Sequence, residues 1–372
     1  MESNNYIGSF AQENVVFQTT VVERSAFGDN FKRVMIFTEQ TLIADTSALA
    51  AVEGSDSIKV ATVTADTYAS IATGILQSWL TDLFVNGNLE EAYLVINGTS
   101  TLTSQLQEDA YDLLKAYAYW KTVCVPATST AALDDARFNA LAVTLADLCA
   151  VDKQVLSGPV LAPLSTVAAS GWSSDARYTA LKDKFVFMSY HPDATHNAAL
   201  YSVGLALSLY NSSGTPVGNS LDMTKSNNMT SSNASRTVRD AMKDAYVQSW
   251  KPVGDNSAYV AAIGDKALNG DVISANWIVA YVTYMTKARI AILMTAPNFY
   301  RNNENYQQIL NIMMGYINKF TGRLVSITCT APSFETLPAS AADELVIPNA
   351  WEATYVDHIR KVTISGTLYI GE

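Results

Sequence analysis

Charge is scarce in this chain. Asp, Glu, Lys and Arg make up 16% of its 372 residues, whereas an average soluble domain has about 25%. Hydrophobic residues make up 49%. This excludes an intrinsically disordered chain, because apolar burial can offset the entropy lost on folding. A surface with so few charges is typical of one that becomes buried against other chains.

Positive charge and long apolar runs are both lacking. Lys and Arg number 24 against 35 Asp and Glu, and the net charge is −11. Sequence-independent binding of nucleic acid needs a positive field, so we expect no nucleic acid partner, and an anionic membrane surface is equally disfavoured. The most apolar stretch, residues 272–285, contains Ser274 and Asn276. It falls short of the ~20 residues of a membrane span and predicts a buried helix.

Residues that commonly build metal and redox sites are few. The three cysteines lie far apart and form no CxxC pair, so we expect small buried hydrophobes in a reducing cytoplasm: Cys124, Cys149 and Cys329. Phosphate-binding loops, dinucleotide fingerprints, GxSxG elbows and HExxH motifs do not occur in the sequence. The first residues show no signal-peptide pattern. We therefore expect no cofactor, no metal and no enzyme activity.

One short segment has the residue types of a chemical site. His191 and His196 flank Asp193 directly after a predicted strand, and ligands of open α/β sheets bind at the carboxyl ends of strands. Two imidazoles and a carboxylate are able to ligate a metal or transfer protons. However, Pro192 and Asp193 are also ordinary helix-initiating residues, and five residues is a poor spacing for one helical face. We favour the structural interpretation.

The length of the chain favours two domains. Residues 26–210 predict an α/β domain, because strand patterns at 34–37, 58–63, 92–96, 122–125 and 185–189 alternate with helical patterns at 66–84, 104–120 and 134–148. This rhythm is typical of βαβ units and a largely parallel sheet. Residues 211–235 are almost wholly polar and predict a loop or an exposed hairpin.

Residues 236–358 predict an α+β domain. Helical patterns cover 235–250, 258–268, 274–296 and 304–320, and strand patterns follow at 323–330 and 351–356. Because these helices and strands are segregated rather than alternating, we expect a separate layer architecture. The predicted fold class is therefore α/β plus α+β.

Both ends of the chain carry strand patterns, and the N-terminal one has no hairpin partner nearby. The N-terminal arm, residues 1–25, alternates at Val15, Phe17, Thr19 and Val21, and the C-terminal strand, residues 359–372, alternates at Val362, Ile364, Leu368 and Ile370. An uncaptured strand is an aggregation hazard, and donation to a neighbour's sheet removes it. Twenty extended residues reach ~65 Å. We therefore expect a self-assembling subunit with strand exchange at these eight residues.

The order of segments along most of the chain resembles that of the contractile tail sheath proteins of myophages. The similar segments are a strand and a helix at 57–84 with a strand at 90–96, then two helices at 274–294 and 305–324 with a strand at 325–332, and a closing strand pair at 349–370. The resemblance lies in this linear arrangement, and it covers phage-derived contractile injection machines as well.

The resemblance implies a structural role. Such subunits stack as hexameric rings into a helical sleeve around the tail tube, and the sleeve contracts to drive the tube through the host envelope. Residues 236–358 and the N-terminal arm would lie nearest the tube, with the 26–210 domain farther out and the arms completing neighbours' sheets. The implied partners are further copies of the chain, the tail tube protein, and baseplate and tail terminator proteins. The implied place is the virion, after assembly in the host cytoplasm.

Two basic residues are candidates for contact with the tail tube. Lys319 and Arg323 lie at the end of the predicted 304–320 helix.

Two alternative functions remain. The first is another phage or surface-layer structural subunit, such as a tail-tube, baseplate or capsid-associated protein, although a tail tube is usually an all-β barrel. The second is an α/β enzyme that uses the His191–His196 cluster.

Overall fold

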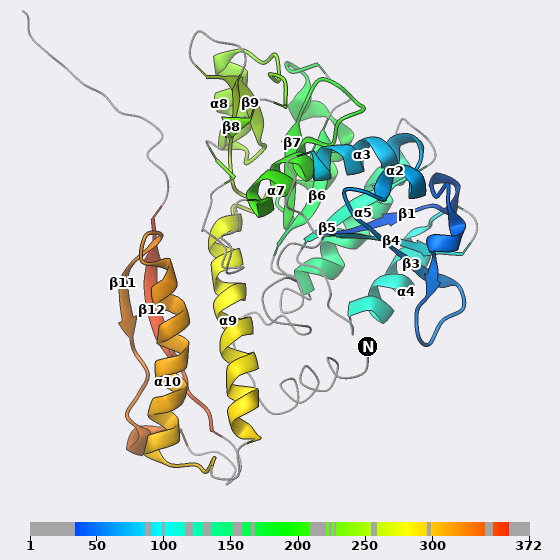
Figure 1. The fold of residues 1–372 in the computed structure, drawn as a ribbon. Coiled ribbons are helices and arrows are strands. Elements are labelled where there is room, and N and C mark those ends of the chain that lie inside the picture. Colours follow the sequence, from blue (N-terminus) through cyan, green and yellow to red (C-terminus); the bar gives the residue numbers. More distant parts are fainter. Residues whose placement is uncertain are drawn as a thin grey trace, which may run out of the picture.

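A computed structural model shows a three-layer α/β unit from which one long helix leads into a smaller helical unit (Figure 1). The structure describes residues 34–85, 91–98, 101–115, 122–128, 135–151, 158–164, 168–208, 221–222, 225–226, 228–253, 259–295, 299–338 and 345–356. The predicted strand-exchange residues of both arms lie outside these residues, so strand exchange stays a prediction.

A seven-stranded sheet forms the middle layer of the α/β unit. Its strand order is β2-β3-β4-β1-β5-β6-β7, and β4, β1, β5, β6 and β7 are mutually parallel. Every residue of β1 is fully buried, as expected for a parallel strand covered on both faces. The bounds are β1 Val34–Thr38, β2 Ala50–Ala51, β3 Ile58–Val63, β4 Ala92–Asn97, β5 Thr122–Ala127, β6 Val160–Leu164 and β7 Val186–Tyr190.

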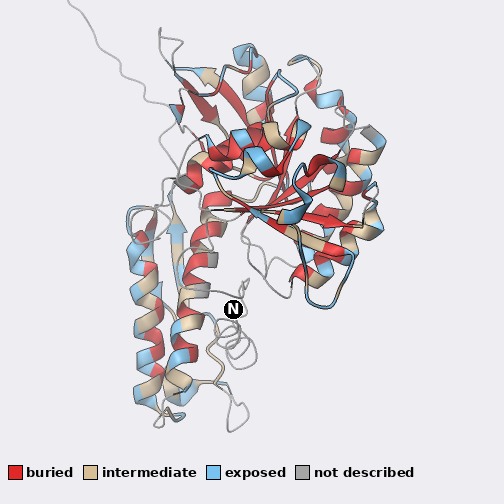
Figure 2. Cartoon of the chain, turned by 45° about the vertical axis from the view of Figure 1, so that its right-hand side comes forward, coloured by how far each residue is buried: buried red, intermediate tan, exposed pale blue. Residues whose placement is uncertain are grey.

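Helices cover both faces of this sheet. Met35 and Phe37 of β1 face α4 (Ser104–Lys115), α5 (Asp135–Val151) and α6 (Ala176–Leu181). Val34 and Ile36 face α3 (Gly74–Phe84) and α7 (Ala198–Ser208). The sheet is therefore buried almost throughout (Figure 2). Each large side chain buried there contributes about 1.5–3 kcal/mol.

The sequence predictions for this unit are partly confirmed. The strands at 34–37, 92–96, 122–125 and 185–189 are β1, β4, β5 and β7. The helix predicted at 66–84 is interrupted at Ala72 and Thr73, which are extended and separate α2 (Tyr68–Ile71) from α3, whose first residue Gly74 has φ +59°. Strand β3 is antiparallel to β4 rather than part of a βαβ unit. The sequence interpretation missed β6, α6 and α7.

A small antiparallel sheet continues the large one beyond β7. Its order is β8 (Lys225–Ser226), β10 (Val260–Ile263), β9 (Ser249–Pro252). The backbone N–H of Gln248 donates to Met188 O (2.9 Å), and Tyr190 N–H donates to Gln248 O (2.8 Å). The helix predicted at 235–250 ends earlier, as α8 (Arg236–Asp244), and Tyr246 with φ +62° turns the chain into β9. The helix predicted at 258–268 is wrong, because β10 pairs there with both neighbours.

Helix α9 (Ile273–Met294) connects the two units. Ile273 and Trp277 lie in the core of the α/β unit, whereas Ile278 and Tyr281 belong to the core of the helical unit. Twenty-two residues make a rod of ~33 Å. The helix is long and apolar enough to cross a membrane, but 56% of its most apolar window is buried inside the protein. Its burial supports the prediction of a buried helix at 272–285.

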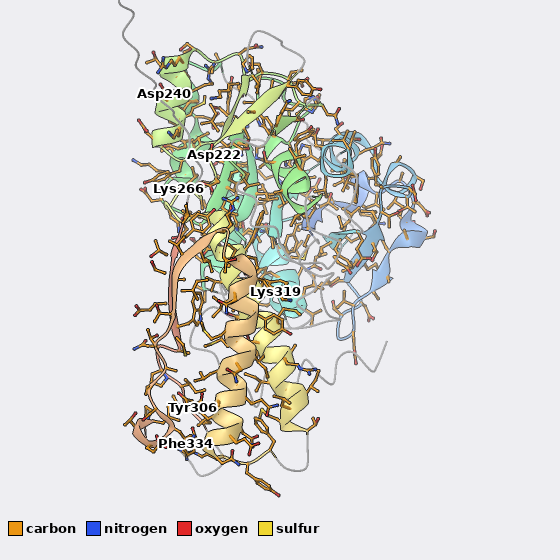
Figure 3. The ribbon with its side chains drawn as sticks, turned by 60° about the vertical axis from the view of Figure 1, so that its left-hand side comes forward. Asp222, Asp240, Lys266, Tyr306, Lys319 and Phe334 are labelled. Carbon is orange, nitrogen blue, oxygen red and sulfur yellow. The ribbon has the colours of Figure 1, made fainter. Side chains whose placement is uncertain are left out.

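The helical unit consists of two antiparallel helices and a strand pair (Figure 1). Helix α10 (Asn303–Ile317) returns along α9, and a 3-10 turn, η5 (Asn318–Phe320), brings the Phe320 ring against Tyr281 with 5.6 Å between centroids. Strands β11 (Leu324–Cys329) and β12 (Trp351–Tyr355) then form an antiparallel pair that packs on α10. Beyond β11, the chain turns at η6 (Phe334–Thr336), and Phe334 lies beside Tyr306 at the far end of α10 (Figure 3).

The predicted domain boundaries stay predictions, because packing does not test which units fold alone. The packing does show that Met242, Val247 and Leu268 belong to the core of the large sheet. The segment before α9 therefore shares its core with the α/β unit rather than with α10. Cys124 and Cys149 are buried as predicted, but Cys329 is exposed on β11, so that part of the cysteine prediction is wrong.

Candidate functional site

The histidine cluster lies where β7 leads into α7. His191 follows β7 directly and is 2% exposed. Its Nδ1 accepts the backbone N–H of Asp193 (3.2 Å), so the ring is neutral with its proton on Nε2, which lies 2.9 Å from Thr230 Oγ1. Burial and the neighbouring His196 both lower the pKa of His191. Both ring nitrogens are thus engaged within the protein.

His196 and the buried Asp82 join α3 to the start of α7. His196 Nδ1 is 2.8 Å from Asp82 Oδ1, and Asp82 Oδ2 accepts the backbone N–H of Asn197 (2.7 Å). This hydrogen bond to the carboxylate raises the pKa of His196. The carboxylate also satisfies one of the donors that a helix start leaves unpaired. Across the described residues, no three His, Cys, Asp or Glu side chains gather as metal ligands.

A buried ion pair occupies the carboxyl end of the sheet beside β1. Glu39, 3% exposed, follows β1, pairs with Arg137 of α5 and accepts the backbone N–H of Leu102 (3.2 Å). Arg137 also donates to Leu102 O (3.1 Å). Open α/β sheets usually bind ligands at this end. Here the protein's own side chains fill the position beside β1, which does not favour a ligand there.

The strand pair β11–β12 is only partly covered by the rest of the described chain. Leu324 is its one buried residue; Ile327, Trp351, Ala353 and Tyr355 are half-buried against α10, and the alternate residues of β12 are exposed. Two exposed valines, Val325 (43%) and Val356 (40%), lie at this strand pair. Two strands alone are marginally stable. This half-covered pair is therefore our candidate assembly site.

Both outer edges of the pair lack a neighbouring strand within the part of the chain that the structure describes. The sheet that contains β11 and β12 has two strands. Leu324 is opposite Tyr355 and Cys329 is opposite Trp351, with a register shift between Val325 and Thr328. An uncovered edge presents unpaired backbone groups and serves as a template for a further strand. The pair is able to accept strands from another chain.

The two predicted tube-contacting residues lie close together. Lys319 is exposed in η5, at the end of α10 that is nearer the α/β unit, and its Nζ lies 5.0 Å from the Tyr316 ring centroid (Figure 3). Arg323 immediately precedes β11 and is half-buried. They therefore flank the start of the assembly strand pair. Contact with a tube remains a prediction.

Some structural contacts had no sequence signal. Asp82 and His196 are 114 residues apart, and Glu39 and Arg137 are 98 apart, so no local pattern connects either pair. The strand pair had a sequence signal. The strand patterns predicted at 323–330 and 351–356 correspond to β11 and β12, but no local pattern showed that these two strands pair with each other.

Comparison with known proteins identifies the fold. The chain matches one in the cryo-EM structure of the anti-feeding prophage (AFP) baseplate, 6-fold symmetrised, with a TM-score of 0.66 and 11% sequence identity. The match covers 95% of this chain and 97% of the other. Neither a protein-family model nor a curated protein matches the sequence. The chain therefore has the fold of a baseplate component across nearly its whole length.

Proposed function

We propose that this chain is a structural subunit of a contractile, phage-tail-like particle. The observation that carries the proposal is the fold shared with a chain of the AFP baseplate over 95% of the sequence. The match includes the helical unit as well as the α/β unit, so it does not reflect a common sheet architecture alone. The scarcity of charge is consistent with a subunit that is largely surrounded by others.

Within that class, we propose a tail sheath subunit. Three features support this finer role: strand-patterned segments at both chain ends, a strand pair whose outer edges have no neighbouring strand among the described residues, and the segment order that resembles sheath proteins. Copies would form hexameric rings that stack into a helical sleeve around a tail tube. The terminal arms of neighbours would complete the β11–β12 sheet. Contraction would then need no nucleotide, because the contracted lattice buries more surface between subunits.

A catalytic role finds less support. His191 and His196 bond to Thr230, Asp82 and the backbone of the loop before α7, and these contacts explain both residues as supports of α7. Lys319 and Arg323 lie just before β11, at the start of the assembly strand pair. We include their contact with the tail tube in the sheath proposal.

A baseplate subunit is the second candidate. It is favoured by the comparison itself, since the matched chain belongs to a baseplate. The two roles differ in their assemblies: a sheath subunit propagates into long tubes, whereas a baseplate subunit stops at a ring. Either role uses the same fold and the same open strand edges.

Electron microscopy of the purified full-length protein, alone and with assembled tail tubes as template, tests the proposal. We expect hollow tubes with a helical repeat; closed rings alone would favour the baseplate role. Deleting residues 1–20 or 360–372 should abolish both while leaving a folded monomer, checked by circular dichroism and sedimentation. Full-length protein that stays monomeric with the template would contradict a structural role, and tubes formed by both deletion variants would contradict strand exchange.

A further inference from the structure

The two histidines in the connection from β7 to α7 have opposite hydrogen-bonding roles. His191 uses a lone pair, because its Nδ1 accepts the backbone N–H of Asp193 (3.2 Å). His196 uses a hydrogen, because its Nδ1 lies 2.8 Å from Asp82 Oδ1 and an ionised carboxylate only accepts. The two rings meet edge to face, with 5.0 Å between their centroids. A proton added to this pair therefore affects its two members differently.

His191 is able to take up a proton only if its contacts break. Its Nε2 already lies 2.9 Å from Thr230 Oγ1, so an added proton goes to Nδ1, where it would point at the Asp193 N–H. The residue is 2% exposed, so water does little to solvate a charge there. Burial, and then the neighbouring His196, lower the pKa of His191. Proton uptake thus requires the ring to leave Asp193 and Thr230.

His196 accepts a proton without any such break. Its side chain is 37% exposed, and its Nε2 lies 3.9 Å from Asp193 Oδ2. A charged His196 ring therefore has a carboxylate at each nitrogen, Asp82 on one side and Asp193 on the other. Hydrogen bonds from Thr195 lower the pKa of Asp193, and the hydrogen bond to Asp82 raises the pKa of His196. Protonation strengthens the contact between α3 and the start of α7.

The surrounding elements add no competing charge. Asp82 is the one charged residue in β5, β6, β7, α3, α7 and the 228–234 segment, and Asp193 is the one in the loop between β7 and α7 apart from the two histidines. Two further titratable groups lie in these elements, Tyr190 at the end of β7 and Cys124 in β5. Burial raises the pKa of both, so both stay protonated in acid. The pH response of the loop therefore belongs to its histidines.

We propose that His191, the Asp193 N–H and Thr230 form an acid-sensitive latch on the connection from β7 to α7. In acid, His191 takes up a proton and the latch opens, so residues 191–195 move away from Thr230. The charged His196 keeps its bond to Asp82, so the start of α7 stays on α3. The loop thus opens at one end and is held at the other, and this holds whichever structural role the chain has.

The two histidines contribute to stability with opposite signs. The pKa of His191 lies below the ordinary value of about 6.5, so its stabilising contacts are present above that pH and are lost as the pH falls. The pKa of His196 lies above that value, so its contribution is present below about pH 6.5 and is lost as the pH rises. If only the open latch binds the proton, opening becomes about tenfold more favourable for each pH unit below about 6.5.

Hydrogen–deuterium exchange, read residue by residue with mass spectrometry, tests the latch in the full-length protein, assembled or not. The comparison is between the Asp193 N–H, which bonds to His191, and the Asn197 N–H, which donates to Asp82 Oδ2 (2.7 Å). After correction for intrinsic exchange rates, we expect the protection of Asp193 relative to Asn197 to fall at least about tenfold from about pH 6.5 to about pH 4.5. A constant ratio in the wild-type protein would overturn the proposal.

His191→Gln is the matched variant. Its side-chain amide can accept the Asp193 N–H and donate to Thr230, but it does not titrate. We expect its protection ratio to stay within about twofold over the same pH range. His358→Gln replaces the third histidine and should keep the wild-type fall. A fall of wild-type size in His191→Gln would show that another group opens the loop, which contradicts the proposal.

A second measurement needs no variant to fold. Deuterium uptake at the Cε1 carbon of each imidazole, followed against pH by mass spectrometry, gives a titration midpoint for each histidine. We expect His196 to titrate at least about one pH unit above His191. Asp82→Asn should then lower the His196 midpoint, because the carboxylate that favours its charge is gone. Coincident midpoints, or the reverse order, would contradict the latch.

Discussion

At the residue scale, Asp82 illustrates how one buried carboxylate organises the end of the sheet. It is 4% exposed and joins α3 to the first turn of α7 through His196 and the Asn197 N–H. The residues that looked most like an active site in the sequence are thus held in a structural network. A buried acceptor that satisfies a helix start is expensive to remove, because the donor it leaves behind stays away from water.

We predict that Asp82→Ala lowers the free energy of unfolding by about 1–3 kcal/mol. The matched control is Asp147→Ala, which breaks the ion pair with Lys184 at a carboxylate that is 59% exposed; it should cost less than about 1 kcal/mol. Urea denaturation of both variants measures the difference. Equal losses of unfolding free energy in the two variants would show that the buried Asp82 contacts stabilise the protein no more than the exposed ion pair does.

At the element scale, the contact between α3 and α7 depends on a glycine. A Cβ built on Gly204 of α7 would lie 2.5 Å from the carbonyl oxygen of Leu83 in α3. Real atoms do not approach so closely, so the absence of a side chain is what lets these helices meet. Gly315 in α10 is the opposite case, since a Cβ there would meet no atom within 4 Å.

We predict opposite effects for alanine at these two glycines. Gly204→Ala should destabilise the protein by about 1–3 kcal/mol, because the two helices must separate. Gly315→Ala should stabilise it by about 0.5–1 kcal/mol, because alanine restricts the unfolded chain and favours a helix interior. Thermal or urea unfolding measures both, and a stabilised Gly204→Ala variant would contradict the close packing of α3 on α7.

At the scale of the whole molecule, α9 makes the two units one body. Trp277 is buried in the α/β core, and Tyr281, one turn later, packs against Phe320 in the other core. Because the same helix contributes to both cores without a break, rotation between the units would expose apolar residues on both sides. We therefore expect the two units to move together as one rigid body in any assembly that the chain forms.

Net charge sets a further expectation for assembly. Each copy carries a net charge of −11, so subunits repel one another at low ionic strength. At 0.1 M salt this repulsion is largely screened beyond about 10 Å. We predict that the yield of assembled protein rises between about 0.05 M and about 0.5 M NaCl, measured by sedimentation. A yield that falls with salt would instead indicate interfaces that depend on opposite charges.

The sequence was sufficient to predict most of the secondary-structure elements named below and the low charge of the surface. Strands β1, β4, β5 and β7 and helices α5, α9 and α10 lie where their periodicity predicts, because a residue's alternation between core and solvent depends on neighbours a few positions away. The excess of acidic over basic residues is likewise known from the sequence, and it disfavours a nucleic acid partner. The helix predicted at 258–268 failed because pairing with β8 and β9 overrides local propensity.

The contacts between residues that are far apart in the sequence could be known only from the tertiary structure. It showed that β3 runs antiparallel to β4, that Asp82 engages His196 across 114 residues, and that the pairing of β11 with β12 shifts register between Val325 and Thr328. Such contacts join segments whose local patterns carry no information about each other. A strand pattern predicts that backbone groups need partners, whereas only the packed chain shows which strand edges lack a neighbour among the described residues.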